Sequence, residues 1–401
     1  MPQSAMLPKS TNPRVAPVPV VSSEERSTLT PCHPYLEFFA GSGLVAEGLK
    51  GTFLPVWAND ICAKKAAVYT ANHSDQHFHI GSVADVKGDR LPAAMLAWAS
   101  FPCQDLSLAG LAEGIHGARS GLVWEWLRVI DEMATAPPVL VAENVLGLVS
   151  SAGGEHYKTL HNALVERGYK VGAMALDAVR WVPQSRPRIF VIAVKESIEI
   201  PSNLLASGAT WAHPESVRKA SDGLRNWIWW QLPEPPVRKT DLVDIIDWDA
   251  AAATKEADER NIRLIAPKHA SKLNDLTEFD RFAAPGYKRT REGKQVLELR
   301  FDGVAGCLRT PSGGSSRQFL IVKRDGKIKS RLLTVRETAR LMGAPDSYKI
   351  PGSYNDGYKA MGDAVAVPVA HWLGKKLLLP LANAAHKYIS HSTDMAIATD
   401  N

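Results

Sequence analysis

The chain has 401 residues, of which 45% are hydrophobic and 22% charged, as is ordinary for a globular enzyme with one large or two moderate cores. No apolar run is long enough to cross a bilayer, and the polar N-terminus lacks the apolar core of a signal peptide, so we expect a cytoplasmic protein and no membrane partner. The 4 cysteines are widely spaced without a C-x-x-C pair, which argues against a disulfide framework and a zinc site.

The predicted elements alternate between strands and helices over the first half of the chain. Residues 1–30 are rich in Pro, Ser and Thr and predict a flexible arm. Strands are predicted at 35–40, 54–58, 78–80, 95–100, 139–142, 171–176 and 189–194, and helices end near residues 50 and 72 and span 120–134 and 156–167. This alternation predicts an α/β fold with a mostly parallel, doubly wound, Rossmann-like sheet in a catalytic and cofactor-binding domain over 31–199.

The pattern changes after residue 199. Residues 200–330 contain a Trp-rich and a Pro-rich stretch and short strands at 296–300 and 319–322, which predict a smaller irregular domain. Residues 281–331 hold 13 Lys or Arg against 4 Asp or Glu, an excess typical of a polyanion-binding segment or of a solvated surface. Helical periodicity then returns over 331–385, with a helix at 364–379 that rejoins the large domain, and 386–401 is a tail.

A glycine-rich turn follows the first strand. Gly41-x-Gly43-x-x-Ala46 opens a helix, and such turns let a ligand approach the backbone and the helix N-terminus. Asp60 ends the second strand, where an acid can accept hydrogen bonds from ribose hydroxyls. The pattern fits a dehydrogenase, an S-adenosylmethionine enzyme or an empty tight turn. Phe39 favours the smaller cofactor, because a pyrophosphate needs room over the glycines.

Cys103 follows Phe101-Pro102 at the end of the fourth strand, and Glu143 ends the next. Ligands in open α/β sheets lie at these strand ends. Each residue has an ordinary structural interpretation, Cys103 as a buried hydrophobe and Glu143 as a surface acid. Together they suit cytosine chemistry, because a thiolate added to C6 activates C5 while an acid receives the charge at N3. Arg186 and Arg188 alternate in direction, so one can point into the crevice, or both can form structural ion pairs.

The ordered set of motifs resembles the DNA cytosine-5 methyltransferases of bacterial restriction–modification type over residues 35–380. The matching segments are Phe39–Gly43, Phe101–Gly110, Glu143–Val145, Gln184–Arg188, Arg336–Gly343 and Met361–Pro368. The resemblance implies transfer of a methyl group from S-adenosyl-L-methionine to cytosine C5 at a specific sequence of double-stranded DNA. By the same resemblance, we expect the modification enzyme of a restriction–modification system, or an orphan or phage methyltransferase. We expect it to be a monomer and to associate with the nucleoid.

Residue roles follow from the same resemblance. Cys103 is the expected nucleophile and Glu143 the N3 partner, while Arg186 and Arg188 orient the flipped cytosine and the active-site loop. Residues 104–120 are expected to form a mobile lid, and 200–330 the target-recognition domain. The expected cofactor pocket comprises Phe39, Ala40, Gly41, Gly43, Leu44, Asp60, Ile61, Ser82, Val83, Pro102 and Asp363. Ser82 and Asp363 depart from the Asp and Asn usual in the family, which affects the adenine contact and adds a charge near the methionine end.

Competing interpretations have their own evidence. A Rossmann-type dehydrogenase explains the glycine turn but gives Cys103 and Glu143 no shared role. An RNA cytosine methyltransferase has similar chemistry, although the large variable domain with its basic end favours duplex DNA. A catalytically inactive DNA-binding protein would not need the Cys–Glu pair. His73, His77 and His79 cluster on a predicted surface turn without a nearby Cys, so we expect no metal site there.

Overall fold

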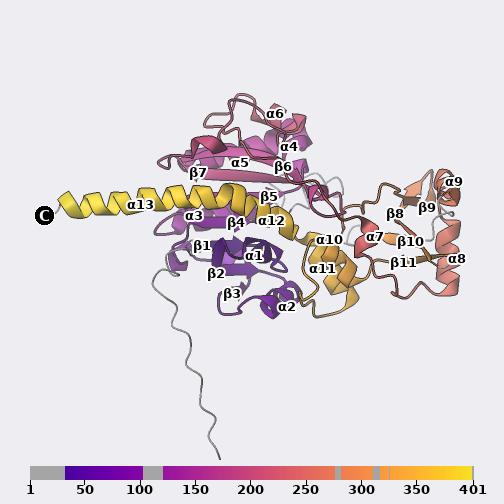
Figure 1. Ribbon diagram of the computed structural model, residues 1–401. Helices are drawn as coiled ribbons and strands as arrows, with labels where there is room; N and C mark the ends of the chain where they lie inside the picture. Colours follow the sequence, from indigo (N-terminus) through magenta and orange to yellow (C-terminus); the bar gives the residue numbers. More distant parts are fainter. Residues whose placement is uncertain (1–31, 103–120, 276–280, 310–316, 325, 400–401) are drawn as a thin grey trace, which may run out of the picture. The chain divides into compact units, whose positions relative to one another are not determined.

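The computed structural model describes residues 32–102, 121–275, 281–309, 317–324 and 326–399. A seven-stranded sheet has the order β3-β2-β1-β4-β5-β7-β6 (Figure 1). Its strands are β1 His33–Phe38, β2 Phe53–Asp60, β3 Phe78–Ile80, β4 Leu96–Ala99, β5 Val139–Asn144, β6 Tyr169–Asp177 and β7 Pro187–Lys195. Strands β3, β2, β1, β4 and β5 pair in parallel, and β7 pairs antiparallel with β5 and with β6.

Helices cover both faces of this sheet. The helices of the described chain as a whole, including α8 and α9 beside the second sheet, are α1 Leu44–Leu49, α2 Ala63–Asn72, α3 Leu122–Glu132, α4 Gly147–Ser150, α5 Glu155–Glu166, α6 Glu215–Ser221, α7 Leu242–Ile245, α8 Lys255–Arg263, α9 Pro267–Asp275, α10 Val335–Leu341, α11 Tyr354–Asp363, α12 Val367–Leu373 and α13 Leu379–Thr399. Alternate residues of each central strand face opposite cores, as the period of two requires. Val141 packs in the core with α1 and α12, whereas Ala142 packs in the core with α3 and α5. The predicted doubly wound α/β class is confirmed.

A second, antiparallel sheet has four strands in the order β11-β10-β8-β9. These strands are β8 Phe282–Arg291, β9 Lys294–Leu299, β10 Phe319–Arg324 and β11 Lys327–Leu332. The β8–β9 hairpin turns at Glu292 and Gly293, whose φ angles of 49° and 74° suit a tight two-residue loop. The sequence predicts an irregular domain here, with strands only near β9 and β10. The regular sheet is therefore larger than the pattern indicates.

The C-terminal part also differs in detail from the prediction. The predicted helix at 364–379 is divided into α12, a π-helical turn at Gly374–Leu378, and α13, which continues to Thr399. Buried side chains between residues 198 and 246 belong to the core beside the large sheet. The domain boundaries given above remain predictions. Among the described residues, no helix has both the length and the hydropathy needed to span a membrane.

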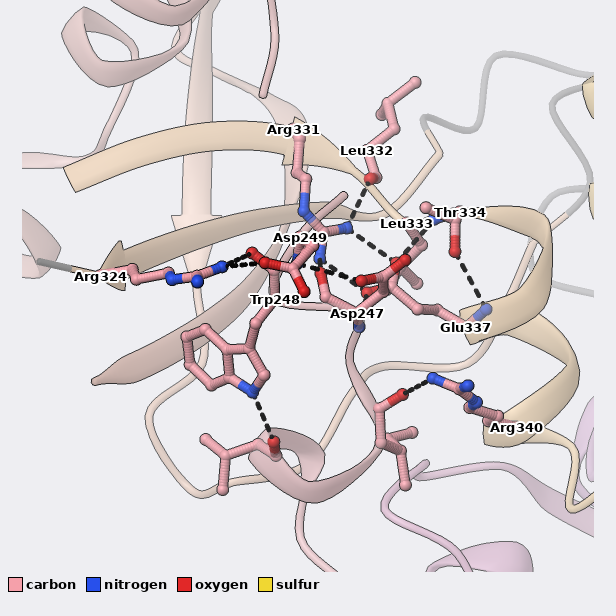
Figure 2. Close-up of polar contacts among 12 residues, drawn as sticks. Asp247, Trp248, Asp249, Arg324, Arg331, Leu332, Leu333, Thr334, Glu337 and Arg340 are labelled. Atoms are coloured by element: carbon pink, nitrogen blue, oxygen red, sulfur yellow. Dashed lines mark hydrogen bonds and ion pairs between the residues drawn. The ribbon is translucent and has the colours of Figure 1, made fainter. Parts of the chain in front are cut away.

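A buried ion pair joins the antiparallel sheet to helix α10 (Figure 2). Arg331 at the end of β11 lies 2.6 Å from Glu337, and the two side chains are 5% and 0% exposed. Glu337 also accepts hydrogen bonds from the backbone N–H groups of Thr334 and Asp247, at 2.7 and 2.8 Å. Arg331 donates to the carbonyl oxygen of Asp247 at 2.8 Å. The loop before α8, the strand and the helix are thus held by one satisfied network.

We predict that Glu337→Ala destabilises the fold by about 3–5 kcal/mol, because it leaves the Arg331 guanidinium buried without its partner. Urea unfolding followed by tryptophan fluorescence measures the shift. The control is Lys219→Ala, which removes the exposed ion pair with Glu215 and should cost less than about 1 kcal/mol. Equal unfolding midpoints for the two variants would contradict this role of the buried pair.

Candidate active site

The glycine turn after β1 is held against the end of β2. Gly41 N–H donates to the Asp60 carboxylate at 2.9 Å, and Ala40 N–H donates to the Asn59 carbonyl at 2.8 Å. Phe39, Gly41 and Gly43 have positive φ angles of 56°, 57° and 78°. Only glycine adopts such angles freely, so the conformation at Phe39 is costly and must be held by its neighbours. The predicted residues Phe39 to Gly43 and Asp60 therefore do lie together.

The turn is fixed from its other side by residues that the sequence reasoning missed or set aside. The His73 ring donates from Nε2 to the Gly43 carbonyl at 3.0 Å, and the Tyr348 hydroxyl donates to the Ser42 carbonyl at 2.5 Å. The Ser42 hydroxyl donates to the carbonyl of Ala360 in α11 at 3.0 Å. Burial lowers the pKa of His73 to about 4, so the ring is neutral. Their large sequence separation left no local pattern that could identify them.

The neighbouring strand ends supply the rest of the expected cofactor pocket. Ile61 is 72% exposed directly after Asp60, which leaves an apolar side chain available to a flat ring. The Ser82 hydroxyl accepts from the backbone N–H of Ala84 at 3.2 Å and thereby caps a short helical turn. Val83 and Leu44 are buried and belong to two different hydrophobic cores. Pro102 is partly buried at the last described position before Cys103.

Asp363, the second departure from the family pattern, forms an ion pair. Its carboxylate lies 2.7 Å from the Lys65 ammonium, which comes from the first turn of α2. The negative charge of Asp363 is therefore balanced within the protein. Lys65 was not singled out from the sequence, because a lysine in the first turn of a helix is usually a solvated surface residue.

Glu143 lies at the carboxyl end of β5 and is 6% exposed. Because β7 runs antiparallel to β5 with Glu143 opposite Phe190, the start of β7 brings Arg188 to the same end of the sheet. Arg188 Nε lies 3.2 Å from the Glu143 carboxylate. Burial raises the pKa of Glu143, and this outweighs the lowering by Arg188 and Arg186. The site thus favours a protonated carboxyl more than water does.

Asn144 joins the ends of β4 and β5. Its side-chain amide donates to the Phe101 carbonyl at 3.1 Å, and both residues are buried. The bond holds the start of the Phe101-Pro102 loop beside Glu143. Cys103 itself and the expected lid at 104–120 lie outside the described residues, as do residues 310–316.

Arg186 occupies a different environment from Arg188. It is 2% exposed and donates to the carbonyls of Gly362 and Ala364 at 2.9 and 2.6 Å. A third contact joins its Nη1 to the Cys307 sulfur at 3.2 Å. The guanidinium therefore orders the surrounding backbone, and the geometry brings Arg188 rather than Arg186 to Glu143.

Cys307 was not identified from the sequence as a site residue. It lies between the two guanidiniums, with Arg188 Nη2 at 4.0 Å from its sulfur. Burial raises the pKa of the Cys307 thiol, but Arg186 and Arg188 lower it by a larger amount, so the net shift of the pKa is downward. The two guanidiniums therefore stabilise the thiolate form of Cys307 relative to the thiol.

The three clustered histidines have separate structural partners. His73 binds the glycine turn, His77 lies 3.0 Å from the Tyr69 hydroxyl, and His79 stacks on Trp57 with ring centroids 5.7 Å apart. Among the residues that the structure describes, no group of three or more His, Cys, Asp or Glu side chains is arranged to hold a metal ion.

Comparison with known proteins matches residues 34–379 to the family model described as C-5 cytosine-specific DNA methylase. The type II methyltransferase M.HhaI of Haemophilus parahaemolyticus is 24% identical over 344 residues, or 84% of this chain and 92% of the relative. M.Eco47II of Escherichia coli is 28% identical over 362 residues, or 86% and 78% of the two chains. A similar fold is found in the DNMT2 of Spodoptera frugiperda, with a TM-score of 0.57, 17% identity, and coverage of 86% and 99%.

We predict that Gly43→Ala destabilises the protein more than Gly51→Ala, although both glycines have φ of 78°. A β-carbon on Gly43 would lie 2.8 Å from the His73 ring, whereas nothing lies within 4 Å of one on Gly51. The shared backbone strain costs about 1 kcal/mol, and overpacking adds about 1–3 kcal/mol at Gly43 alone. Urea unfolding of the two variants measures the difference, and equal losses would show that the turn has room for a side chain.

Proposed function

The chain belongs to the C-5 cytosine-specific DNA methylases, and we propose that it uses Cys103 and Glu143 to methylate a flipped cytosine of duplex DNA with S-adenosylmethionine. The protein is thus a DNA methyltransferase that modifies carbon 5 of cytosine, and DNA is its partner. The proposal concerns the cofactor, the residues and the course of the reaction.

The hydrogen bond from Asn144 to Phe101 is the observation that carries the residue assignment. It ties the loop that leads to Cys103 to the strand end that carries Glu143. Cys103 is the second residue after Phe101, a span of at most about 7 Å along the backbone. Cys103 can therefore act on a ring that Glu143 also contacts. This closeness is what addition to C6 and proton transfer at N3 require.

Glu143 has the properties of the acid partner. Its pKa is raised by burial, so a larger fraction stays protonated near neutral pH than for an exposed glutamate. Arg188 at 3.2 Å fixes its orientation and can hold the base carbonyl. A protonated carboxyl can donate to N3 and stabilise the charge that develops there during thiolate addition.

The pocket beside the glycine turn fits S-adenosylmethionine. Asp60 can accept hydrogen bonds from the ribose, and exposed Ile61 can pack against the adenine. Bound there, the cofactor supplies an electrophilic methyl group on its sulfonium.

The reaction then follows from the chain's own groups. The target cytosine leaves the stack at a cost of a few kcal/mol. The Cys103 thiolate forms a bond to C6 while Glu143 gives its proton to N3. C5 takes the methyl group as its bond to the sulfonium breaks, and the neutral thioether leaves. The C5 proton is then lost to solvent water, the bond from sulfur to C6 breaks to restore the ring and the Cys103 thiolate, and the N3 proton returns to Glu143.

We propose that the residues after the large sheet recognise the DNA. The basic segment at 281–331 can hold phosphates, with strong dependence on salt. We propose that base contacts come from residues within 200–330. The likeness to type II methyltransferases supports a role as a modification enzyme. We further propose that the protein acts on the nucleoid as a monomer. RNA is the alternative acceptor, and parallel methylation assays with duplex DNA and RNA of the same sequence separate the two.

We predict that Cys103→Ala abolishes methyl transfer but retains DNA binding. The wild-type chain should also form a covalent adduct with duplex DNA that carries 5-fluorocytosine, because fluorine replaces the proton that must leave C5. Intact-mass measurement with cofactor present detects the adduct, and Cys32→Ala, which removes an exposed free cysteine, serves as the control. An adduct in the Cys103→Ala variant, or turnover by it, would refute the nucleophile assignment. Bisulfite sequencing of DNA from expressing cells identifies the site.

We predict that Arg188→Met moves the alkaline limb of the kcat profile to higher pH. Protonated Glu143 is the active form, so activity is lost as pH rises through its pKa. Arg188 lowers that pKa, and removing the guanidinium therefore raises it. The variant will also be slower, but the position of the limb is independent of the maximal rate. A limb that stays in place or moves to lower pH would contradict the role of Glu143 as the acid.

A further inference from the structure

Lys65 lies over the glycine turn, next to the expected position of the cofactor's amino-acid end. Its Cδ is 3.9 Å from the point where a β-carbon on Gly41 would stand, so its stem covers the open side of that glycine. Its ammonium lies 2.7 Å from the Asp363 carboxylate, and the side chain is 17% exposed. Asp60, which binds Gly41 N–H, also stabilises the charged lysine.

The charges of this group complement those of S-adenosylmethionine. Lys65, Asp60 and Asp363 comprise one formally positive and two formally negative side chains, a formal sum of −1. The cofactor carries a sulfonium, an ammonium and a carboxylate, which sum to +1. Burial lowers the pKa of Lys65, but Asp363 and Asp60 together raise it by a larger amount, so the ammonium stays charged. The group thus offers a cation, Lys65, to the carboxylate and an anion, Asp363, to the ammonium.

We propose that Lys65 pairs with the carboxylate of the cofactor's methionine end while Asp363 pairs with its ammonium. Lys65 is then a specificity-determining residue, which favours intact S-adenosylmethionine over its decarboxylated analogue. The inference rests on the proposed function, since it takes S-adenosylmethionine as the cofactor.

A purely structural role would make Lys65 a tie between α2 and α11. The neighbouring pair Lys64–Asp356 joins the same two helices at 2.7 Å. Lys64 is 70% exposed and lies at the surface, whereas Lys65 is largely covered and faces the turn. The same two helices thus carry one exposed ion pair and one beside the cofactor turn. Lys64 is therefore the matched control for Lys65.

Isothermal titration of the full chain with S-adenosylmethionine and with decarboxylated S-adenosylmethionine tests the proposal. Lys65→Met should weaken binding of the intact cofactor about tenfold, the equivalent of 1.4 kcal/mol, and that of the analogue less than about twofold. Lys64→Met should change neither by more than about twofold. Lys65→Arg keeps the charge and should retain most of the preference, which provides a second variant if the methionine variant folds poorly.

Equal weakening of both ligands by Lys65→Met would overturn the proposal and make Lys65 a structural support. Unchanged binding of the intact cofactor would overturn it as well. Either result leaves the proposed function intact, because the wild-type chain still binds S-adenosylmethionine. Absence of wild-type binding to either ligand would instead refute the cofactor assignment on which the proposal rests.

Discussion

The buried guanidinium of Arg186 holds together three chain segments that meet at the crevice. It binds the backbone carbonyls of Gly362 and Ala364 and contacts the sulfur of Cys307. Gln184 reinforces this junction, donating to the Leu341 carbonyl at 2.8 Å and accepting from Leu308 N–H at 3.0 Å. A buried arginine without such acceptors would be strongly destabilising. The hydrogen bonds of Arg186 to residues 362 and 364 therefore hold the C-terminal segments beside the large sheet.

The antiparallel direction of β7 explains why this junction lies at the active site. A parallel strand would bring its carboxyl end to the ends of β4 and β5. Because β7 runs in the opposite direction, its first residues arrive there, and Arg186 and Arg188 precede or begin it. Arg188 then faces Glu143, while Arg186 donates hydrogen bonds to the backbone of residues 362 and 364. One strand reversal thus supplies both a group for the site and its scaffold.

The sequence predicted the large sheet well because its strands are buried on both faces and appear as apolar runs. Strands β8 and β11 were missed because basic residues such as Lys288, Lys327 and Lys329 interrupt their apolar pattern. The pairing of Arg188 with Glu143 was within reach of motif spacing. The inward role of Arg186 was not, because alternation in an extended segment says that two side chains diverge, not which one meets the substrate.

The charges of the site are paired before any ligand is present. Lys65 balances Asp363 at the cofactor turn, and Arg188 lies against Glu143 and Cys307 at the base end. A lone buried charge would carry a desolvation cost of several kcal/mol, whereas a paired one exchanges partners when a ligand arrives. The Asp at position 363 is therefore tolerated because a lysine faces it. When the cofactor binds, its carboxylate and ammonium can replace the Lys65–Asp363 ion pair without leaving either side chain unpaired.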